Sequence, residues 1–399
     1  MPIRLKFWLV TVSLIWTATF AAAGDISFRE VVLDAAAAKK TCYAVELADV
    51  DGDGDQDIVV VTDNRVQWYE QPSWDKHVIL EDQTTLDNVC IASHDIDQDG
   101  QVDFALGAGW TKVGTIQWIT RNADPKALWT VHAIGVEPST HRMRWANVLG
   151  KDRPQLVVSP LKASSGTGVR LTAFEIPDDP KHDRWPATVL DDSLNRMHNH
   201  WHIDFNGDGI ASTITASQEG LSLIRREDDG GFGRRLVGSG LPGDKPEASG
   251  AGEAKVGRLA RGRPFMATVE PMHGTTVAVY TAPPQLPEGE LATRYVLDDT
   301  LQQGHAVWCV DLDGDGVDEV VIGHREPGTG DIKGPGVYVY RATAEDGSKW
   351  TKQVVDDGGM ACEDLVCSDL TGDGRPDIVA VGRKTLNVKL YVNDGTGHK

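Results

Sequence analysis

The chain has 399 residues, of which 59 are acidic and 39 basic, giving a formal net charge of −20 at neutral pH. Because no basic stripe is present to neutralise phosphates, this composition argues against nucleic acid as a partner. The length exceeds that of an average domain but suits one closed ring of repeats.

The first residues have the pattern of an export signal. Arg4 and Lys6 precede an apolar stretch over residues 7–20, which is followed by three alanines ending at Ala23. This order predicts a signal peptide over residues 1–23 and one mature domain over residues 24–399. An uncleaved anchor is the alternative, although the stretch is short for a membrane span. We expect a secreted or periplasmic protein with no membrane span after signal removal.

A short acidic loop recurs along the rest of the chain. Its pattern is D-x-D/T-x-D-G-x-x-D/E, with clear copies from Asp49, Asp95, Asp311 and Asp369 and a weaker copy from Asp204. Positions 1, 3, 5 and 9 offer oxygen ligands, and the glycine at position 6 allows a sharp turn. Calcium prefers such oxygen sets, whereas solvated Asp/Gly turns are the alternative. The predicted calcium ligands are Asp49, Asp51, Asp53, Asp57, Asp95, Asp97, Asp99, Asp103, Asp204, Asn206, Asp208, Asp311, Asp313, Asp315, Glu319, Asp369, Thr371, Asp373 and Asp377.

The spacing of the loops predicts the architecture. Counting degenerate copies at Asn147 and Val256, a loop begins roughly every 50 residues, the length of one four-stranded propeller blade. Valine and isoleucine runs follow the loops, and alternation with period two, as in residues 337–340, excludes helical repeats. A β-helix is the competing fold, but its repeats are shorter. The sequence therefore predicts an all-β, seven-bladed β-propeller.

The two ends of the chain are expected to close the ring. Six blades end in a similar outer strand, whereas the last blade has none after Tyr391. The seventh copy, residues 31–34, lies near the N-terminus and can pair with the last blade, which leaves no unpaired edge. Cys42 and Cys362 would then lie in neighbouring blades. A disulfide between them and burial as free thiols are both compatible with the sequence.

The face opposite the acidic loops gathers histidines. Each inner strand begins at that face, six residues before its loop, where the chain has Tyr43, Val89, His141, His198, Gly250, His305 and Glu363. Three histidines at one aligned position are unexpected for packing alone. The second strands should return to the same face, six residues after position 9, at Asp63, Gly109, Leu161, Gln218, Glu270, Arg325 and Arg383.

These residues predict a metal-assisted site around one funnel. Imidazoles with a carboxylate suit Zn²⁺ or a similar divalent ion, and the predicted ligands are His141, His198, His305 and Glu363. An unligated imidazole would serve as general base near neutral pH. The candidate catalytic residues are His200, His324, Arg325, Arg383, Glu270 and His273. The alternative is that the histidines are hydrogen-bonded structural residues and the arginines join blades through salt bridges.

The acidic loops followed by Val/Ile strands resemble the FG-GAP and VCBS repeat family over nearly all of the mature chain. That resemblance implies the fold and not a function, because such propellers serve adhesion, binding and catalysis alike. A narrower resemblance, to the N-terminal propeller of the aldos-2-ulose dehydratases, rests on GHAVW at 304–308, DLDGDGVDE at 311–319, GHR at 323–325 and GPGV at 334–337.

The narrower resemblance implies dehydration of a ketosugar such as 1,5-anhydrofructose, assisted by a divalent metal. We therefore expect a secreted, metal-dependent carbon–oxygen lyase acting on a ketosugar or a related carbohydrate. One alternative is a polysaccharide lyase acting on uronates. The other is a non-catalytic calcium-binding propeller that binds a glycan or a protein.

Overall fold

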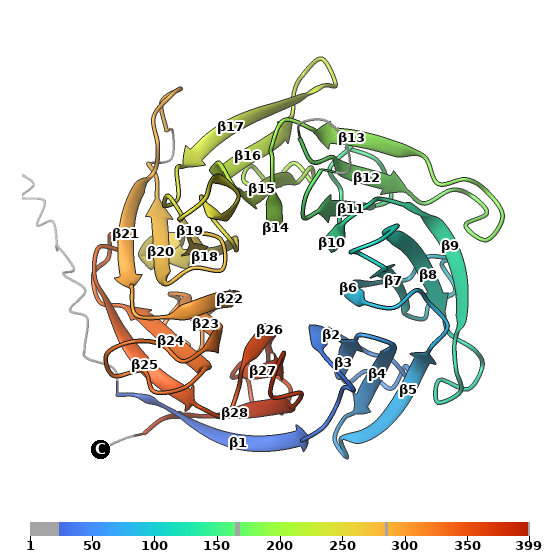
Figure 1. Cartoon of the computed structure of the whole chain (residues 1–399), viewed down its shortest axis with the longest axis horizontal. Coiled ribbons are helices and arrows are strands. Elements are labelled where there is room, and N and C mark those ends of the chain that lie inside the picture. Colours follow the sequence, from blue (N-terminus) through green and yellow to red (C-terminus); the bar gives the residue numbers. More distant parts are fainter. Residues whose placement is uncertain (1–23, 164–167, 284–285, 398–399) are drawn as a thin grey trace, which may run out of the picture.

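The computed structural model describes residues 24–163, 168–283 and 286–397; the predicted signal peptide lies outside these ranges. The described residues form seven four-stranded antiparallel sheets, which Figure 1 shows as blades around a central axis. Their only helical turns are the short 3₁₀ segments Pro246–Ala248 and Ala260–Gly262, and none of their helices could span a membrane. The predicted seven-bladed β-propeller is confirmed.

Blades one to six follow the chain in order, each running from an inner to an outer strand. The first three comprise β2 (Cys42–Ala48), β3 (Asp57–Thr62), β4 (Arg65–Glu70) and β5 (Asp75–Glu81); β6 (Asn88–His94), β7 (Asp103–Ala108), β8 (Thr115–Thr120) and β9 (Thr130–Val136); and β10 (Thr140–Ala146), β11 (Gln155–Pro160), β12 (Leu171–Glu175) and β13 (Ala187–Asp191). The next three comprise β14 (Met197–Ile203), β15 (Ser212–Ser217), β16 (Gly220–Arg226) and β17 (Phe232–Gly238); β18 (Lys255–Leu259), β19 (Arg263–Glu270), β20 (Thr276–Thr281) and β21 (Thr293–Asp298); and β22 (Gln302–Val310), β23 (Glu319–Glu326), β24 (Gly336–Ala342) and β25 (Trp350–Asp357).

The seventh blade takes strands from both ends of the chain. It contains β26 (Cys362–Ser368), β27 (Asp377–Gly382), β28 (Val388–Thr396) and, at its outer edge, β1 (Ile26–Asp34). β1 pairs antiparallel with β28, from Ile26 opposite Thr396 to Asp34 opposite Val388. In Figure 1 the blue β1 lies along the red β28. The predicted closure of the ring is therefore confirmed.

The hydrophobic core lies between neighbouring blades. Second strands such as β3, β7 and β27 are buried along their whole length because a blade covers each of their faces. This explains why they read as continuous apolar runs. Cys42 and Cys362 are buried in two different interblade clusters and are free thiols. The disulfide considered from the sequence is therefore not formed.

The fifth blade differs from the register predicted from its sequence. The Lys255 ammonium lies 3.8 Å from the ring centre of Trp201 and 4.6 Å from that of Trp308. Both tryptophans stand three residues before their loops. Lys255 therefore occupies the position three residues before the loop in its own blade. The loop of the fifth blade then begins near Arg258, two residues later than the predicted Val256. Gly250, predicted to face the funnel, instead pairs with Leu241 in an isolated bridge.

Candidate functional site

A β-bulge stands at the same place in six of the seven inner strands. The pairing register with the second strand shifts at Tyr43, Val89, His141, His198, His305 and Glu363. A bulge inserts an extra residue and re-aims its side chain out of the regular alternation. These six are the residues predicted to stand six positions before the loops. The histidines and the glutamate thus reach the channel from the bulges.

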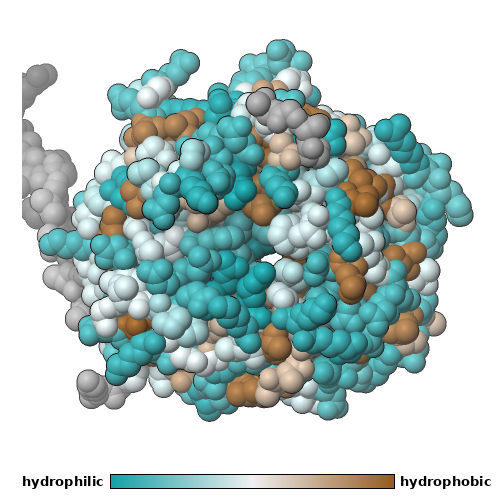
Figure 2. Space-filling model, viewed as in Figure 1, coloured by the Kyte–Doolittle hydropathy of each residue, from teal (hydrophilic) through white to brown (hydrophobic). Residues whose placement is uncertain are grey.

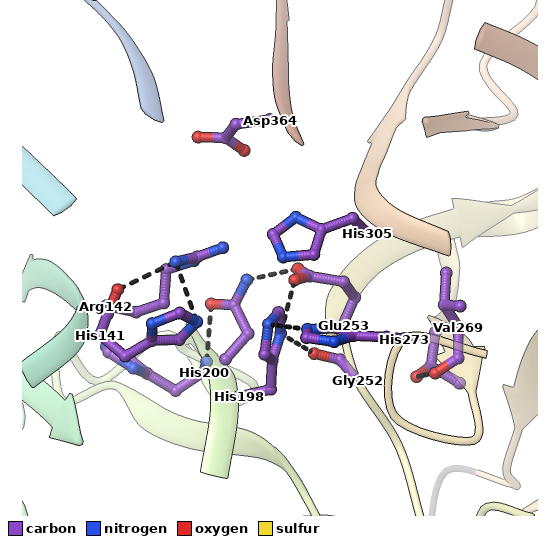
Figure 3. A network of polar contacts seen from close by, with 12 residues as sticks. His141, Arg142, His198, His200, Gly252, Glu253, Val269, His273, His305 and Asp364 are labelled. Carbon is purple, nitrogen blue, oxygen red and sulfur yellow. Dashed lines mark hydrogen bonds and ion pairs between the residues drawn. The ribbon is translucent and has the colours of Figure 1, made fainter. Parts of the chain in front are cut away.

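Three imidazoles meet beside the channel axis, and we call His198, His273 and His305 the histidine cluster. One ring nitrogen from each lies within 4.8 Å of those of the other two. The Nε2 atoms of His198 and His273 are 2.7 Å apart. Figure 3 shows the three rings converging, with Glu253 beside them and Arg142 and His141 across from them.

The turn between β19 and β20 carries His273 into the cluster. His273 has a φ of +53°, a left-handed conformation that histidine adopts more readily than most residues. The amide of Gly304 donates to the carbonyl of Gly274 over 2.9 Å, which docks this turn against β22 next to His305. A side chain at Gly304 would come within 2.5 Å of Val269, so the close approach requires glycine there.

Hydrogen bonds at Nδ1 fix the orientation of the His198 and His305 rings. His198 Nδ1 lies 2.6 Å from the carbonyl oxygen of Gly252 and 3.0 Å from Glu253 Oε1. His305 Nδ1 lies 2.5 Å from the carbonyl oxygen of Glu363. Since these acceptors need a donor, each Nδ1 carries the proton and each Nε2 keeps its lone pair. Such oriented, neutral imidazoles are the usual form of metal-binding histidines.

The cluster histidines are held neutral. Burial lowers their pKa values well below the ordinary value, and the positive charge of Arg142 for His198, and of Arg325 for His305, acts in the same direction. For His273, burial is the largest cause of the lowered pKa, and the neighbouring His198 lowers the pKa further. Metal binding requires deprotonated imidazole, which is the state that these surroundings favour.

Two predicted metal ligands have other contacts. Glu363 accepts from Arg383 Nη1 over 2.6 Å and from Arg325 Nη1 over 3.1 Å, whereas its carboxylate is 3.9 Å from His305 Nε2. The His141 ring packs on His198 with centroids 4.8 Å apart, yet its nitrogens lie outside the described metal-ligand group. The geometry therefore brings His273 together with His198 and His305, whereas His141 and Glu363 lie outside this group.

Three predicted catalytic residues point away from the cluster. His200 Nδ1 is 2.9 Å from Ser159 Oγ of the third blade, and His324 Nδ1 is 2.9 Å from the carbonyl oxygen of Glu326. The bulge at His198 interrupts the alternation of the strand, so His200 is turned between blades although it stands only two residues after His198. Glu270 is fully buried and bonded to Tyr280 and Arg294. These contacts are structural, so the structure does not join the three residues to the site.

The structure adds two residues that sequence reasoning missed. Glu253 lies against His198, and Asn199 Nδ2 donates to its carboxylate. Arg142 is buried beside His141, with its Nη1 3.3 Å from His141 Nε2. Glu253 was missed because the fifth blade lacks the acidic loop from which its register could be counted. Arg142 directly follows a predicted ligand, which was the available signal.

Carboxylates converge in the acidic loops on the opposite face. In three of them, the carboxylates at positions 1, 3 and 5 offer oxygens within 4.8 Å of one another, at Asp49, Asp51 and Asp53, at Asp95, Asp97 and Asp99, and at Asp311, Asp313 and Asp315. The acid at position 9 caps the loop: Asp57 accepts from the amides of Val50 and Gln71, each over 2.9 Å. Burial raises the pKa of Asp57 to about 6, and Asp51 adds negative charge nearby.

Two other loops form the same turn with fewer carboxylates. In the degenerate third loop, Gln155 accepts from the amides of Val148 and Leu149 over 3.0 and 2.9 Å. An amide oxygen thus replaces the carboxylate as the cap. In the fourth loop, Asn206 Nδ2 donates to Asp208 over 2.8 Å. The turn itself therefore does not require the full acidic set, which leaves the extra carboxylates for another purpose.

Two family models match different segments of the chain. The model of the aldos-2-ulose dehydratase β-propeller domain matches residues 113–283, which include His198 and His273. The FG-GAP-like repeat model matches residues 49–106 and 311–380, which hold the four clear acidic loops. Aldos-2-ulose dehydratase of Phanerodontia chrysosporium is 30% identical over 266 residues, 62% of this chain and 29% of that protein. The chain therefore spans less than a third of that relative's length.

Solved structures share the fold. A chain of an Agrocybe aegerita lectin that recognises non-reducing terminal N-acetylglucosamine has a TM-score of 0.51 and 17% identity, covering 80% of this chain and 81% of that one. A mitotic checkpoint complex chain has a TM-score of 0.56 and 11% identity, covering 97% and 100%. An exotype rhamnogalacturonan lyase has a TM-score of 0.50 and 13% identity, covering 94% and 76%. In sequence, the chain is thus a β-propeller with FG-GAP-like repeats that resembles the propeller domain of aldos-2-ulose dehydratase.

Proposed function

We propose that this protein is a metal-dependent carbohydrate dehydratase, a carbon–oxygen lyase that removes water from a ketosugar. The observation that carries the proposal is the histidine cluster, in which three imidazoles converge and burial keeps them neutral. Two of its members lie in the part of the chain that resembles the aldos-2-ulose dehydratase propeller. A purely structural propeller would not need them there.

His198, His273 and His305 would hold the ion, and three imidazoles suit Zn²⁺ or a similar transition metal. The outer contacts of His198 and His305 leave both Nε2 lone pairs directed inward. When bound, such an ion supplies a Lewis acid that polarises a carbonyl oxygen. A cluster of three protein ligands keeps a position open for substrate, as in catalytic sites.

His141 is the proposed hydrogen-bond donor to the substrate. Its Nε2 faces Arg142 Nη1, which can only donate, so the proton of the neutral ring is on Nδ1. That buried Nδ1 has no partner among the described residues. Burial and Arg142 lower the pKa of His141 well below its ordinary value, which keeps the ring neutral. A neutral imidazole N–H can stabilise the oxygen of an enolate that forms when the α-proton leaves.

Arg325 and Arg383 are proposed as positioning residues. Both hold the carboxylate of Glu363, whose own carbonyl orients His305. In the reaction, the α C–H bond and the β C–O bond break, a C=C bond forms, and water leaves. The uronate alternative would need these arginines for the substrate carboxylate. Their engagement with Glu363 favours a neutral ketosugar instead.

We also propose that the acidic loops bind Ca²⁺ as a structural ion. The support is the convergence of three carboxylates in each of three described loops, together with raised pKa values of the buried caps, to about 6 for Asp57 and Asp103 and about 8 for Glu319. In each case burial is the largest cause. Buried negative charge without a counter-ion is unfavourable, and a hard cation would relieve it.

The test combines metal analysis with turnover. The protein is dialysed, its metal content is measured by mass spectrometry, and ketosugars and uronates are screened for an ultraviolet-absorbing enone or unsaturated uronate. We expect one transition-metal equivalent in addition to calcium, and enone formation only from ketosugars. Metal-loaded protein that binds glycans but converts no sugar would overturn the dehydratase proposal. Unsaturated uronate as the only product would show that the substrate is a uronate and not a ketosugar.

A further inference from the structure

A polar cavity is formed by the inner strands; none of the three cluster histidines lines it, although it shares Arg142 with their surroundings. It has a volume of about 260 Å³, and its lining includes Arg144, Trp201, Lys255, Trp308 and Asp364. The proposed dehydration uses none of these side chains. Figure 2 shows a small opening at the centre of the ring, bordered largely by hydrophilic residues.

Lys255 is the unusual member of this cavity. It is only 5% exposed, and its ammonium makes no hydrogen bond or ion pair with any residue in the described ranges. Its neighbours are the faces of Trp201 and Trp308, from the blades on either side, with ring centres at 3.8 and 4.6 Å. Lysine is almost never buried unless it is paired.

The charged groups around Lys255 come from three other strands. The Arg144 guanidinium lies 5.0 Å from the Trp201 ring and donates to Asn199. Asp364 accepts from the amides of Val45 and Leu365, and Glu46 accepts from Ser93. Glu253, two residues before Lys255, faces His198 and Asn199. None of these carboxylates lies within 4 Å of the Lys255 ammonium in a described ion pair.

This environment favours the neutral amine. Burial lowers the pKa of Lys255 to about 7, with Arg144 acting in the same direction and Glu253, Asp364 and Cys309 opposing it. About half of the amine would then be neutral at pH 7, against roughly 0.04% for an ordinary lysine. Desolvation and a neighbouring cation are the means by which lysine becomes a nucleophile.

We propose that Lys255 is a nucleophilic amine that captures a small aldehyde or ketone in the channel as an imine. The neutral Nζ attacks the carbonyl carbon to give a carbinolamine, and loss of water then gives the C=N bond. Asp364 lines the same cavity, and burial raises its pKa, so it can supply the proton that leaves with the hydroxyl. Two N–H protons and the carbonyl oxygen leave as water, with no redox change.

The ligand class follows from the cavity. A volume of about 260 Å³ admits a compound of a few carbons, and the buried arginine and carboxylates can hydrogen-bond its hydroxyl groups. An open-chain hydroxyaldehyde or hydroxyketone fits these properties. The inference goes beyond the proposed dehydration, because imine formation requires neither the metal nor the histidine cluster.

The test is reductive trapping with dihydroxyacetone and sodium cyanoborohydride at pH 7, followed by digestion and peptide mass spectrometry. We expect Lys255 to be labelled at least about tenfold faster than the exposed Lys112 and Lys349, since its larger neutral fraction outweighs restricted access. Labelling should begin near pH 6 and level off above pH 8. Lys255→Met should remove this label and leave the labelling of both exposed lysines unchanged.

Two results would overturn the proposal. One is labelling of Lys255 no faster than that of Lys349 in protein with an unchanged melting curve. The other is labelling that rises only above about pH 9, as for an ordinary lysine. A His273→Ala variant separates this proposal from the dehydratase proposal, because it should lose turnover while Lys255 remains as reactive as before. If labelling fails in a protein that still dehydrates ketosugars, only the lysine inference is lost.

Discussion

The two faces of the propeller are built in opposite ways. The acidic loops repeat one pattern, are largely exposed and place their converging carboxylates within a single turn. The histidine cluster draws each member from a different blade, through bulges in β14 and β22 and the turn after β19. The loop face therefore follows the repeat, whereas the cluster face departs from it. In a repeat protein, such departures are where a specific function can be placed.

The largest expected effect is a loss of metal affinity and turnover when the histidine cluster is altered. His273→Ala should lower transition-metal affinity and turnover at least about 100-fold, because it removes one of the three proposed ligands while its turn is held by Gly274 and Gly304. Metal titration and initial rates would measure this. The matched control is His182→Ala, which alters a histidine side chain that is 78% exposed. Equal losses in both variants would remove the cluster from the mechanism.

The next effect addresses the loop face. Asp53→Ala should cost about 2 kcal/mol of stability in saturating calcium, or a few degrees in melting temperature, because bound ion stabilises the folded state. In chelator the variant should be no less stable than the parent, since one of three converging negative charges is removed. Asp152→Ala, in the degenerate third loop, is the control and should not respond to calcium. A calcium-independent loss at Asp53 would mean that the loop is only a turn.

A third prediction concerns His200, which lies two residues after His198 in β14. Burial, with His202 and Arg144, keeps the pKa of His200 well below that of the unfolded chain. Below about pH 6.5 the unfolded state takes up a proton that the folded state cannot, so stability falls as pH falls, by up to about 1.4 kcal/mol per pH unit. His200→Gln should remove only the share of this slope that His200 contributes, measured by chemical denaturation at several pH values, without changing metal content. A variant that loses metal would place His200 in the site after all.

The smallest effect distinguishes loops of the same face. Arg341 Nε lies 3.2 Å from Asp313 and 3.6 Å from Glu319, so the sixth loop already contains a cation. Arg341→Met should raise the calcium affinity of this loop by about threefold to tenfold, in line with a modest ion pair. Calorimetric titration, with the first loop as internal reference, would measure it. Weaker binding in the variant would show that the arginine supports the site.

Features that repeat from blade to blade could be predicted from the sequence, whereas features of a single blade could not. Period-two strands, loop spacing and the missing last strand were enough for seven blades and for pairing of residues 31–34 with the last blade. His198 and His305 could be found by counting back from their loops. The fifth blade has no such loop, so Glu253 and the level of Lys255 were not found. His200 was assigned to the site because a sequence does not reveal the bulge that separates it from His198.

The pairing of β1 with β28 has a consequence for the making of the protein. Among the strands of the propeller, β1, which completes the last blade, is synthesised first, and its partner β28 is synthesised last. At about 5–20 residues per second, the early strand waits on the order of half a minute before its partner exists. A product that stops early, at any point, leaves an open sheet edge that proteases and chaperones can recognise. The ring thus closes only after all seven blades have been synthesised, which makes closure a check on their complete translation.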